Sequence, residues 1–178
     1  MTYFKYFNKG YYDITGTGNK KLVTDLMTRV KVRSQVLDQA SLYDRYDVTD
    51  GDRPETIAFN HFGSAQYHWI ILLTNNITDA YYGWPLSNAD FEKYITEKYS
   101  NPDGIHHYEI TQSSGKTSGN GPNDYSHKVE VNSDASGAQS VSNREYEQRL
   151  QDEKRTIRLL NPSYLPIFLE EFEKLVSK

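Results

Sequence analysis

The chain has 178 residues, of which 20 are basic and 24 acidic, so its formal net charge is −4. This length favours one domain with an appendage, and the mild acidity argues against nucleic acid as the main partner, because phosphate binding needs a basic surface. The chain has no cysteine, which excludes disulfides and thiolate metal sites, and its longest apolar run, residues 69–73, is far below the ~20 residues of a membrane span.

Aromatic residues are frequent, with 15 tyrosines, seven phenylalanines and two tryptophans, although hydrophobic residues make up only 37% of the chain. The low apolar content indicates that part of the chain is loop or arm rather than core. Tyrosine and tryptophan suit surfaces that are dry in an assembly and wet outside it, because each carries an apolar body with a polar tip. A tyrosine-rich core is the alternative. The first residues lack the apolar region of a secretory signal, so we expect a soluble protein without an export signal.

Residues 1–42 predict an N-terminal arm followed by a short helix. The first 19 residues are rich in aromatic side chains without a helical or alternating period, and they end in the turn-prone stretch 16–19. We expect an extended arm whose rings need something to pack on. Residues 24–30 carry an N-cap pattern before apolar residues, which predicts one or two helical turns.

A strand, a turn and a helix start are expected next. Residues 46–48 are typical of a short strand, and Asp50-Gly51 is a turn signal. Asp52 stands three residues before Glu55, a capping-box spacing that predicts the start of a helix.

That first helix is expected to end at Gly63. Ser64 can then cap a second helix through residues 67–73, which is apolar nearly all round and must therefore be buried on several sides. Residues 81–86 predict a closing strand. The segment 43–88 thus has the order strand, helix, helix, strand.

The segment 89–143 changes character along its length. A helix is expected over residues 89–99. In the 32 residues 112–143 there are eight serines, four glycines and four asparagines, so half of the stretch is small and polar. The alternating pieces 106–111 and 128–131 predict a long-looped hairpin, which is marginal in water alone and is expected to be mobile or docked on a neighbour.

Residues 144–178 return to regular structure. A charged helix is expected over residues 144–155, and residues 156–160 either continue it or switch to a strand. Ser163 can cap a last helix with Pro166 at its third position. The apolar stripe of that helix follows the i, i+3, i+4, i+7 rule and consists of Leu165, Phe168, Leu169, Phe172, Leu175 and Val176.

Motifs for chemistry are incomplete. Residues 114–117 read Ser-Gly-Lys-Thr, the end of a phosphate-binding loop, but Ile110 stands where its first glycine is needed. The histidines show no i,i+4 metal pair, and His106 and His107 would point to opposite faces of a strand. A ligand pair of His107 and His127 across the hairpin is the alternative to ordinary surface histidines. Without a nucleophile elbow, a thiol or a placed carboxylate pair, we expect no enzyme, no cofactor, no metal and no small-molecule substrate.

Residues 46–63, followed by residues 72–76, resemble the lysin-motif (LysM) domain. That family has the βααβ order, a Gly-Asp turn before its first helix, matched by Gly51 and Asp52, and an asparagine near the end of its second helix. Arg53-Pro54 replaces the usual threonine, and residues 81–84 replace the Pro-Gly-Gln turn, both around the loops with which sugar-binding members hold N-acetylglucosamine chains. The resemblance implies a peptidoglycan- or chitin-binding module as the alternative function.

A second resemblance covers more of the chain, including both ends, with residues 112–143 as the variable part. The chain is similar to the baseplate wedge protein 53 family of T-even-type contractile-tailed phages, on residues 23–26, 53–55, 63, 66–69, 72–76, 81–84 and the tail from 153–157 through 172–175. The resemblance implies a structural virion protein of the tail baseplate, made late and assembled in the host bacterial cytoplasm. It further implies an embedded LysM-like fold and a role in clamping neighbouring wedges, beside the wedge-bundle proteins and the small sheath-initiating wedge protein.

We therefore expect an α+β fold with a small βααβ LysM-like core, an N-terminal arm, a polar hairpin or loop insertion and C-terminal helices. The expected segments are residues 1–42, 43–88, 89–143 and 144–178. Apolar side chains in the closing strand and the last helix are the candidate partner-binding residues, since they can bury area against neighbouring subunits. These candidates are Tyr81, Tyr82, Trp84, Leu165, Phe168, Phe172 and Leu175, and the alternative for the first three is that they cover the second helix.

Overall fold

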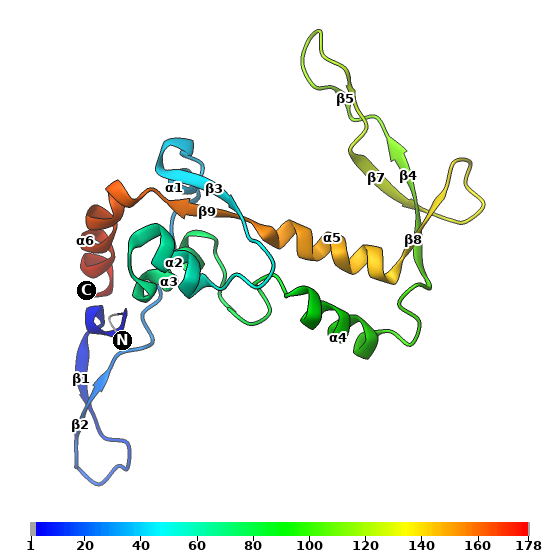
Figure 1. Cartoon of the computed structure of the whole chain (residues 1–178). Helices are drawn as coiled ribbons and strands as arrows, with labels where there is room; N and C mark the ends of the chain where they lie inside the picture. Colours follow the sequence, from blue (N-terminus) through cyan, green and yellow to red (C-terminus); the bar gives the residue numbers. More distant parts are fainter. Residues whose placement is uncertain (1–2, 178) are drawn as a thin grey trace. The chain divides into compact units, whose positions relative to one another are not determined.

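The computed structural model describes residues 3–177 and divides the chain into two compact units (Figure 1). Unit 1 contains residues up to Pro85 and from Lys154 onward, and unit 2 is Leu86–Glu153. Both units combine helices with short strands, which confirms the expected α+β class. The division into four segments stays a prediction. Within the described residues, no helix is long and apolar enough to cross a membrane.

Unit 1 is built on a two-stranded antiparallel sheet of β3 (Tyr43–Asp47) and β9 (Thr156–Leu160). Helices α2 (Pro54–Phe62) and α3 (His68–Thr74) supply Ile57, Ala58 and Ile71 to a core that also contains Ile157 and Leu159 of β9. Successive side chains of a strand alternate between faces, so Ile157 and Leu159 both point to this core.

The prediction of a closing strand at residues 81–86 was wrong. That stretch turns back on itself, since the N–H of Gly83 bonds to the carbonyl of Asp79, and the Asp79 carboxylate accepts from the N–H groups of Tyr81 and Tyr82. The strand that pairs with β3 is β9, so the ambiguity between helix and strand at residues 156–160 resolves as strand.

The start of unit 1 is a 3-10 turn, η1 (Tyr3–Tyr6), followed by a hairpin of β1 (Lys9–Tyr12) and β2 (Lys21–Thr24). The helix predicted over residues 24–30 does not form. Thr24 pairs with Lys9 in the hairpin, and the Asp25 carboxylate accepts from the N–H of Met27, so that it closes a turn instead of capping a helix. A one-turn helix α1 (Ser34–Leu37) and the turn η2 (Ala40–Leu42) follow.

The turn before α2 forms as predicted, with Gly51 at a φ of 81°, but its carboxylate acts differently from the prediction. Asp52 accepts hydrogen bonds from the N–H and hydroxyl of Thr49 and from the hydroxyl of Tyr46, so it is not part of a capping box. Those hydrogen bonds, first the one from the Thr49 hydroxyl, hold the pKa of Asp52 below its usual value. Arg53 occupies the N-cap position of α2 and makes no side-chain bond there.

Gly63 ends α2 at a φ of 77°, as predicted. The Ser64 hydroxyl accepts from the N–H of Gln66 and so starts η3 (Ala65–Tyr67), which leads directly into α3. The predicted end of α2 at Gly63 and the predicted cap by Ser64 are therefore confirmed, whereas the predicted capping box at the start of α2 was wrong.

The last helix, α6 (Leu165–Val176), follows the turn η4 (Pro162–Tyr164). Its predicted cap was wrong, because the N–H of Ser163 donates to the side chain of Asn161 and no side chain caps α6. Phe172 and Val176 are buried in a second core together with Phe7, Trp69, Ile70 and Leu160. Part of the aromatic N-terminus thus packs within its own chain.

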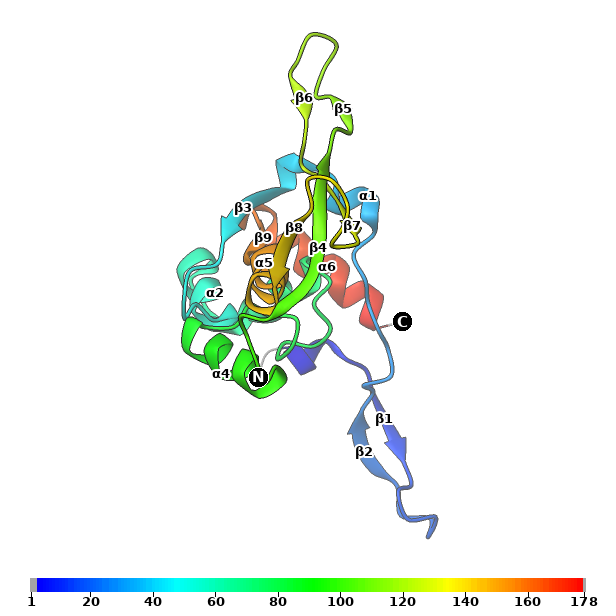
Figure 2. The same ribbon diagram turned by 90° about the vertical axis from the view of Figure 1, so that its right-hand side faces the viewer.

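Unit 2 contains a three-stranded antiparallel sheet, with β4 (Ile105–Gln112) between β7 (His127–Val131) and β8 (Gln139–Ser142) (Figure 2). The predicted hairpin is confirmed, and β8 adds a strand that the sequence pattern did not indicate. The two helices are also as expected, and the hairpin ends in two very short strands. These elements are α4 (Asn88–Lys98), α5 (Asn143–Arg155), β5 (Gly115–Lys116) and β6 (Asn123–Asp124).

Two buried carboxylates are paired inside unit 2. Glu109 on β4 accepts from both terminal nitrogens of Arg149, at 2.7 and 3.0 Å, and from the ammonium of Lys128 at 2.6 Å. Hydrogen bonds from Arg149 and then Lys128 lower the pKa of Glu109 to about 2. Burial raises the pKa of Glu147, but bonds from Lys98 at 2.7 Å and Tyr99 at 2.8 Å outweigh that effect and keep it below its usual value.

The two histidines of β4 do not point to opposite faces, so that prediction was wrong. The register of β4 against β8 shifts between Ile105 and His107, which places His106 at an irregularity of the strand. The Nδ1 atoms of His106 and His107 lie 2.8 Å apart, and the His106 ring stacks on Tyr146 of α5 at a centroid distance of 4.0 Å. His127 pairs with Gln112 at the other end of β4, so it forms no ligand pair with His107.

Candidate partner-binding surface

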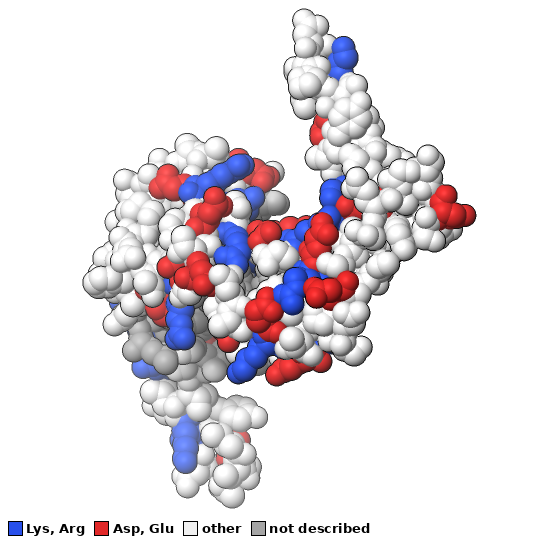
Figure 3. Space-filling view, turned by 45° about the vertical axis from the view of Figure 1, so that its right-hand side comes forward, with Lys and Arg blue, Asp and Glu red and all other residues white. Residues whose placement is uncertain are grey.

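The hairpin of β1 and β2 projects from the rest of unit 1 and is largely white in Figure 3, where it lies at the bottom of the view. Large apolar side chains on it and directly after it are exposed to solvent, most of all Met27, which is 90% exposed. The sequence predicted an aromatic arm that includes two of these residues, Tyr11 and Tyr12, but did not identify the aliphatic positions, since they follow no period. They are Tyr11, Tyr12, Ile14, Leu22, Leu26 and Met27.

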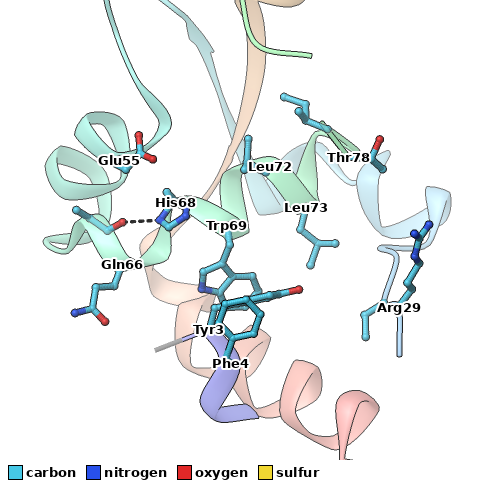
Figure 4. Close-up of a pocket in the computed structure, with 13 residues that line it drawn as sticks. Tyr3, Phe4, Arg29, Glu55, Gln66, His68, Trp69, Leu72, Leu73 and Thr78 are labelled. Atoms are coloured by element: carbon cyan, nitrogen blue, oxygen red, sulfur yellow. Dashed lines mark hydrogen bonds between the residues drawn. The ribbon is translucent and has the colours of Figure 1, made fainter. Parts of the chain in front are cut away.

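A hollow of about 720 Å³ lies beside Trp69 of α3 (Figure 4). Tyr3 and Phe4 of η1 form one wall, while Leu72 and Leu73 of α3 form another. Most of the lining is apolar, and its polar groups stand apart at the two ends. These groups are Glu55, Gln66 and His68 at one end and Arg29 and Thr78 at the other.

Trp69 is fixed in this wall by aromatic packing. Its ring lies 4.5 Å from Phe172 and 5.0 Å from Tyr3, measured between centroids. The indole N–H is buried and has no hydrogen-bond partner within residues 3–177. An unpaired buried donor costs about 1–3 kcal/mol, so the ring contacts with Phe172 and Tyr3 hold Trp69 in place against this penalty.

A second hollow of about 520 Å³ lies along α6 and is likewise mostly apolar. Its wall includes three of the predicted partner-binding residues, Phe168, Phe172 and Leu175. The hydroxyl of Tyr43 is buried at this hollow without a partner in the described part of the chain, and burial raises the pKa of Tyr43.

The structure separates the predicted binding residues into exposed and internal ones. Tyr81 and Tyr82 are 77% and 74% exposed and pack edge to face with each other. Trp84 is only 7% exposed, and its indole N–H donates to the carbonyl of Asp52 at 2.9 Å. Leu175 is half exposed, whereas Phe172 is buried in the second core. Leu165 and Phe168 are partly buried against that core. Only the exposed members are free to meet another protein.

Among residues 3–177, no group of three or more histidine, aspartate or glutamate side chains is placed to hold a metal ion. The buried carboxylates Glu109 and Glu147 are neutralised by basic partners inside unit 2. The described part of unit 1 does expose large apolar side chains, and protein–protein contacts bury area of this kind.

The family model for base plate wedge protein 53 matches residues 3–117, which is well over half of the chain. The chain belongs to the base plate wedge protein 53 family. The match includes the N-terminal hairpin and every residue that lines the first hollow. Baseplate wedge protein gp53 of Enterobacteria phage T4 is 34% identical over 59 residues, which are 33% of this chain and 30% of the T4 protein. The matched stretch is thus less than a third of the length of that relative.

Proposed function

We propose that this chain is a structural component of a phage contractile-tail baseplate, where it joins neighbouring wedges through protein–protein contacts. The observation that carries the proposal is membership of the wedge protein 53 family, over residues that include the exposed hairpin and the hollow beside Trp69. The name of the T4 relative also supports a place in the tail baseplate and a role without catalysis.

The joining would rest on several modest contacts. Apolar side chains are exposed at separate places in unit 1, namely the hairpin, the pair Tyr81 and Tyr82, and Leu175 on α6. Binding at one place raises the effective concentration for the next, so weak contacts add up when all can be made at once. The wedge-bundle proteins and the small sheath-initiating wedge protein are the proposed partners.

We further propose that unit 1 contains a LysM-like core interrupted by unit 2. The order β3, α2, α3 and β9 supports this proposal, since it is βααβ once the inserted residues are set aside. The Gly51-Asp52 turn and the position of Asn75 at the end of α3 add to it.

Glycan binding by this core is disfavoured by Trp84. Trp84 lies in the loop after α3, and its indole N–H donates to the carbonyl of Asp52 in the loop before α2, so it connects the two loops. Its ring also packs in the core that α2 and α3 share. Calorimetry with chito-oligosaccharides tests the point, and we expect no heat of binding. Micromolar binding would favour a glycan-binding module over a wedge joiner.

Complementation tests the main proposal. In a phage strain that lacks this gene, the wild-type protein should restore complete baseplates in electron micrographs. The variants Leu175→Asp and Tyr81→Asp/Tyr82→Asp change exposed side chains and should leave isolated wedges, whereas Glu173→Lys on an exposed polar position of α6 should restore assembly. Normal baseplates with both surface variants would contradict the proposal, and thermal unfolding of each purified variant checks that unit 1 still folds.

A further inference from the structure

The N-terminal arm, defined here as residues 9–33, differs in charge from the rest of the molecule. It contains six basic and two acidic residues, while the remaining residues contain 14 basic and 22 acidic ones. The arm is therefore a positively charged element in an acidic protein. Its basic residues are all exposed and are Lys9, Lys20, Lys21, Arg29, Lys31 and Arg33.

Both acidic side chains of the arm accept hydrogen bonds from backbone N–H groups of the arm itself. The Asp13 carboxylate accepts from the N–H groups of Thr15 and Gly18 in the hairpin loop, and Asp25 closes the turn after β2. None of the six basic side chains forms an ion pair within residues 3–177. The positive charge of the arm is thus available to an outside partner.

The hairpin exposes apolar side chains on both of its faces. Tyr11 and Leu22 are cross-strand neighbours on one face, and Tyr12 and Val23 occupy the other, because successive residues alternate. Tyr11, Tyr12 and Leu22 are each more than half exposed. An isolated two-stranded hairpin is marginal in water, so this element gains most when both faces are covered.

These features select a protein partner. A membrane would cover one face of a hairpin that lies in its plane, but here both faces are apolar. A nucleic acid would be repelled by the net charge of −4 of the whole protein. Its phosphate backbone would also leave the exposed aliphatic side chains of Ile14, Leu22 and Leu26 in water. An acidic cleft with apolar walls satisfies the charge and both faces together.

We propose that the N-terminal arm inserts into an acidic, apolar-walled cleft of another protein of the baseplate. The proposal rests on the function proposed above and assigns the arm as the element that makes one of the joining contacts. The exposed lysines draw the arm toward the cleft, and the tyrosine and leucine side chains then bury their apolar area inside it.

Site-specific photo-cross-linking tests the insertion. A benzophenone amino acid replaces Tyr11 or Tyr12, on opposite faces of the hairpin, in a protein produced during phage infection. A matched control carries it at Tyr125, an exposed tyrosine of unit 2. After irradiation of purified particles, both arm positions should join the same second virion protein at a stretch rich in aspartate or glutamate, and Tyr125 should not.

The outcomes separate this proposal from the function itself. If particles contain the chain but the arm positions join no other virion protein, join only a second copy of the chain, or join nucleic acid or lipid, the arm proposal is overturned while the baseplate role stands. If purified particles lack the chain altogether, the baseplate role fails as well.

Charge reversal tests the electrostatic part. When the wild type and the variant Lys20→Glu/Lys21→Glu are produced together, particles should contain at least about fivefold less of the variant. The reason is that the new carboxylates are repelled by an acidic surface that attracts the lysines. The control Lys93→Glu/Lys116→Glu makes the same charge change on exposed residues of unit 2 and should compete equally. Equal incorporation of the two double variants, with unchanged thermal unfolding, would overturn the acidic cleft.

Discussion

Asn75 is the side chain that ties the end of α3 to β9. Its Nδ2 donates to the carbonyl of Arg158 and its Oδ1 accepts from the N–H of Arg158, both at 2.8 Å. Nδ2 also donates to the carbonyl of Ile71 within α3. One amide therefore satisfies both backbone groups of a strand residue, as a residue of a third strand would do, and it closes this edge of the sheet.

Replacing Asn75 by alanine should lower the free energy of unfolding of unit 1 by about 1–3 kcal/mol, because the N–H of Arg158 loses its side-chain acceptor and the carbonyl keeps only the longer bond from the Thr74 hydroxyl at 3.5 Å. Urea denaturation followed by tryptophan fluorescence measures this selectively, since both tryptophans, Trp69 and Trp84, belong to unit 1. Thr78→Ala, at an exposed position just after α3, is the control and should change stability by less than about 0.5 kcal/mol. Equal stability of the two variants would show that the Asn75 bonds contribute nothing.

Trp84→Phe should also destabilise unit 1 by about 1–3 kcal/mol, because it removes the donor to the partly buried Asp52 carbonyl and leaves a smaller ring in the core. Tyr82→Ala changes an exposed neighbour and should have an effect below about 0.5 kcal/mol. The fluorescence of Trp69 reports both measurements. A larger effect at Tyr82 than at Trp84 would contradict the exposed position of Tyr82 and the internal position of Trp84.

At the scale of elements, the sheet of unit 2 is held to α5 by charge as well as by the stacking of His106 on Tyr146. Glu109 in the middle of β4 bonds to Arg149 of α5 and to Lys128 of β7, so one carboxylate connects three elements. A carboxylate whose pKa is lowered by folding stabilises the folded state only while it is ionised. Acid should therefore weaken unit 2.

The stability of unit 2 should be constant above about pH 4.5 and should fall as the pH drops toward 2, the pKa of folded Glu109, since the unfolded carboxyl binds protons first. Hydrogen exchange of the β4 amides, followed at several pH values, measures this. In Glu109→Gln the loss across that window should be smaller, although the variant is less stable at neutral pH because Arg149 and Lys128 lose their partner. An unchanged slope in the variant would assign the acid response to other groups.

Elements whose signals are local could be predicted from the sequence, and those that depend on distant pairing could not. Gly63 and Ser64 mark the ends of α2 and the start of the next helical turn by chemistry within three residues. The partner of β3 lies far along the chain, as Asp47 and Thr156 show at a separation of 109 positions, and a nearer apolar stretch at residues 81–86 offered a false alternative. The helix predicted after Asp25 was wrong for another reason, because a carboxylate that can cap a helix can equally accept the N–H that closes a turn.

The candidate surface was predictable to the same extent. The stripe of α6 follows from periodicity, but which of its members stay exposed depends on the packing of η1 and α3, so Phe172 is internal and Leu175 is not. The two hollows are lined by residues that are distant in sequence, so no local pattern predicts them.

At the scale of the whole molecule, the tip of the long hairpin in unit 2 carries almost no buried apolar area. Residues 113–126 lie beyond the last β4–β7 pair, Gln112 with His127, and contain only the short strands β5 and β6. Replacing these residues with Asn-Gly, a favoured two-residue hairpin turn, should leave the free energy of unfolding within about 1 kcal/mol of the wild type. Ile95→Ala, in the interior of α4, should cost about 2–5 kcal/mol in the same thermal or urea measurement. A collapse of unit 2 in the shortened protein would show that the tip is needed for folding.

The insertion of unit 2 between α3 and β9 also sets an order of events during synthesis. β3 leaves the ribosome early, yet its only hydrogen-bonded partner strand in the described chain is translated 109 positions later, which takes about 5–20 s at bacterial elongation speeds of 5–20 residues per second. Unit 2 is contiguous and can fold during that interval, while the nascent first unit still exposes its apolar helices. A ribosome that stops before residue 156 thus releases a finished insert attached to an open half-core, which is a ready target for chaperones and proteases.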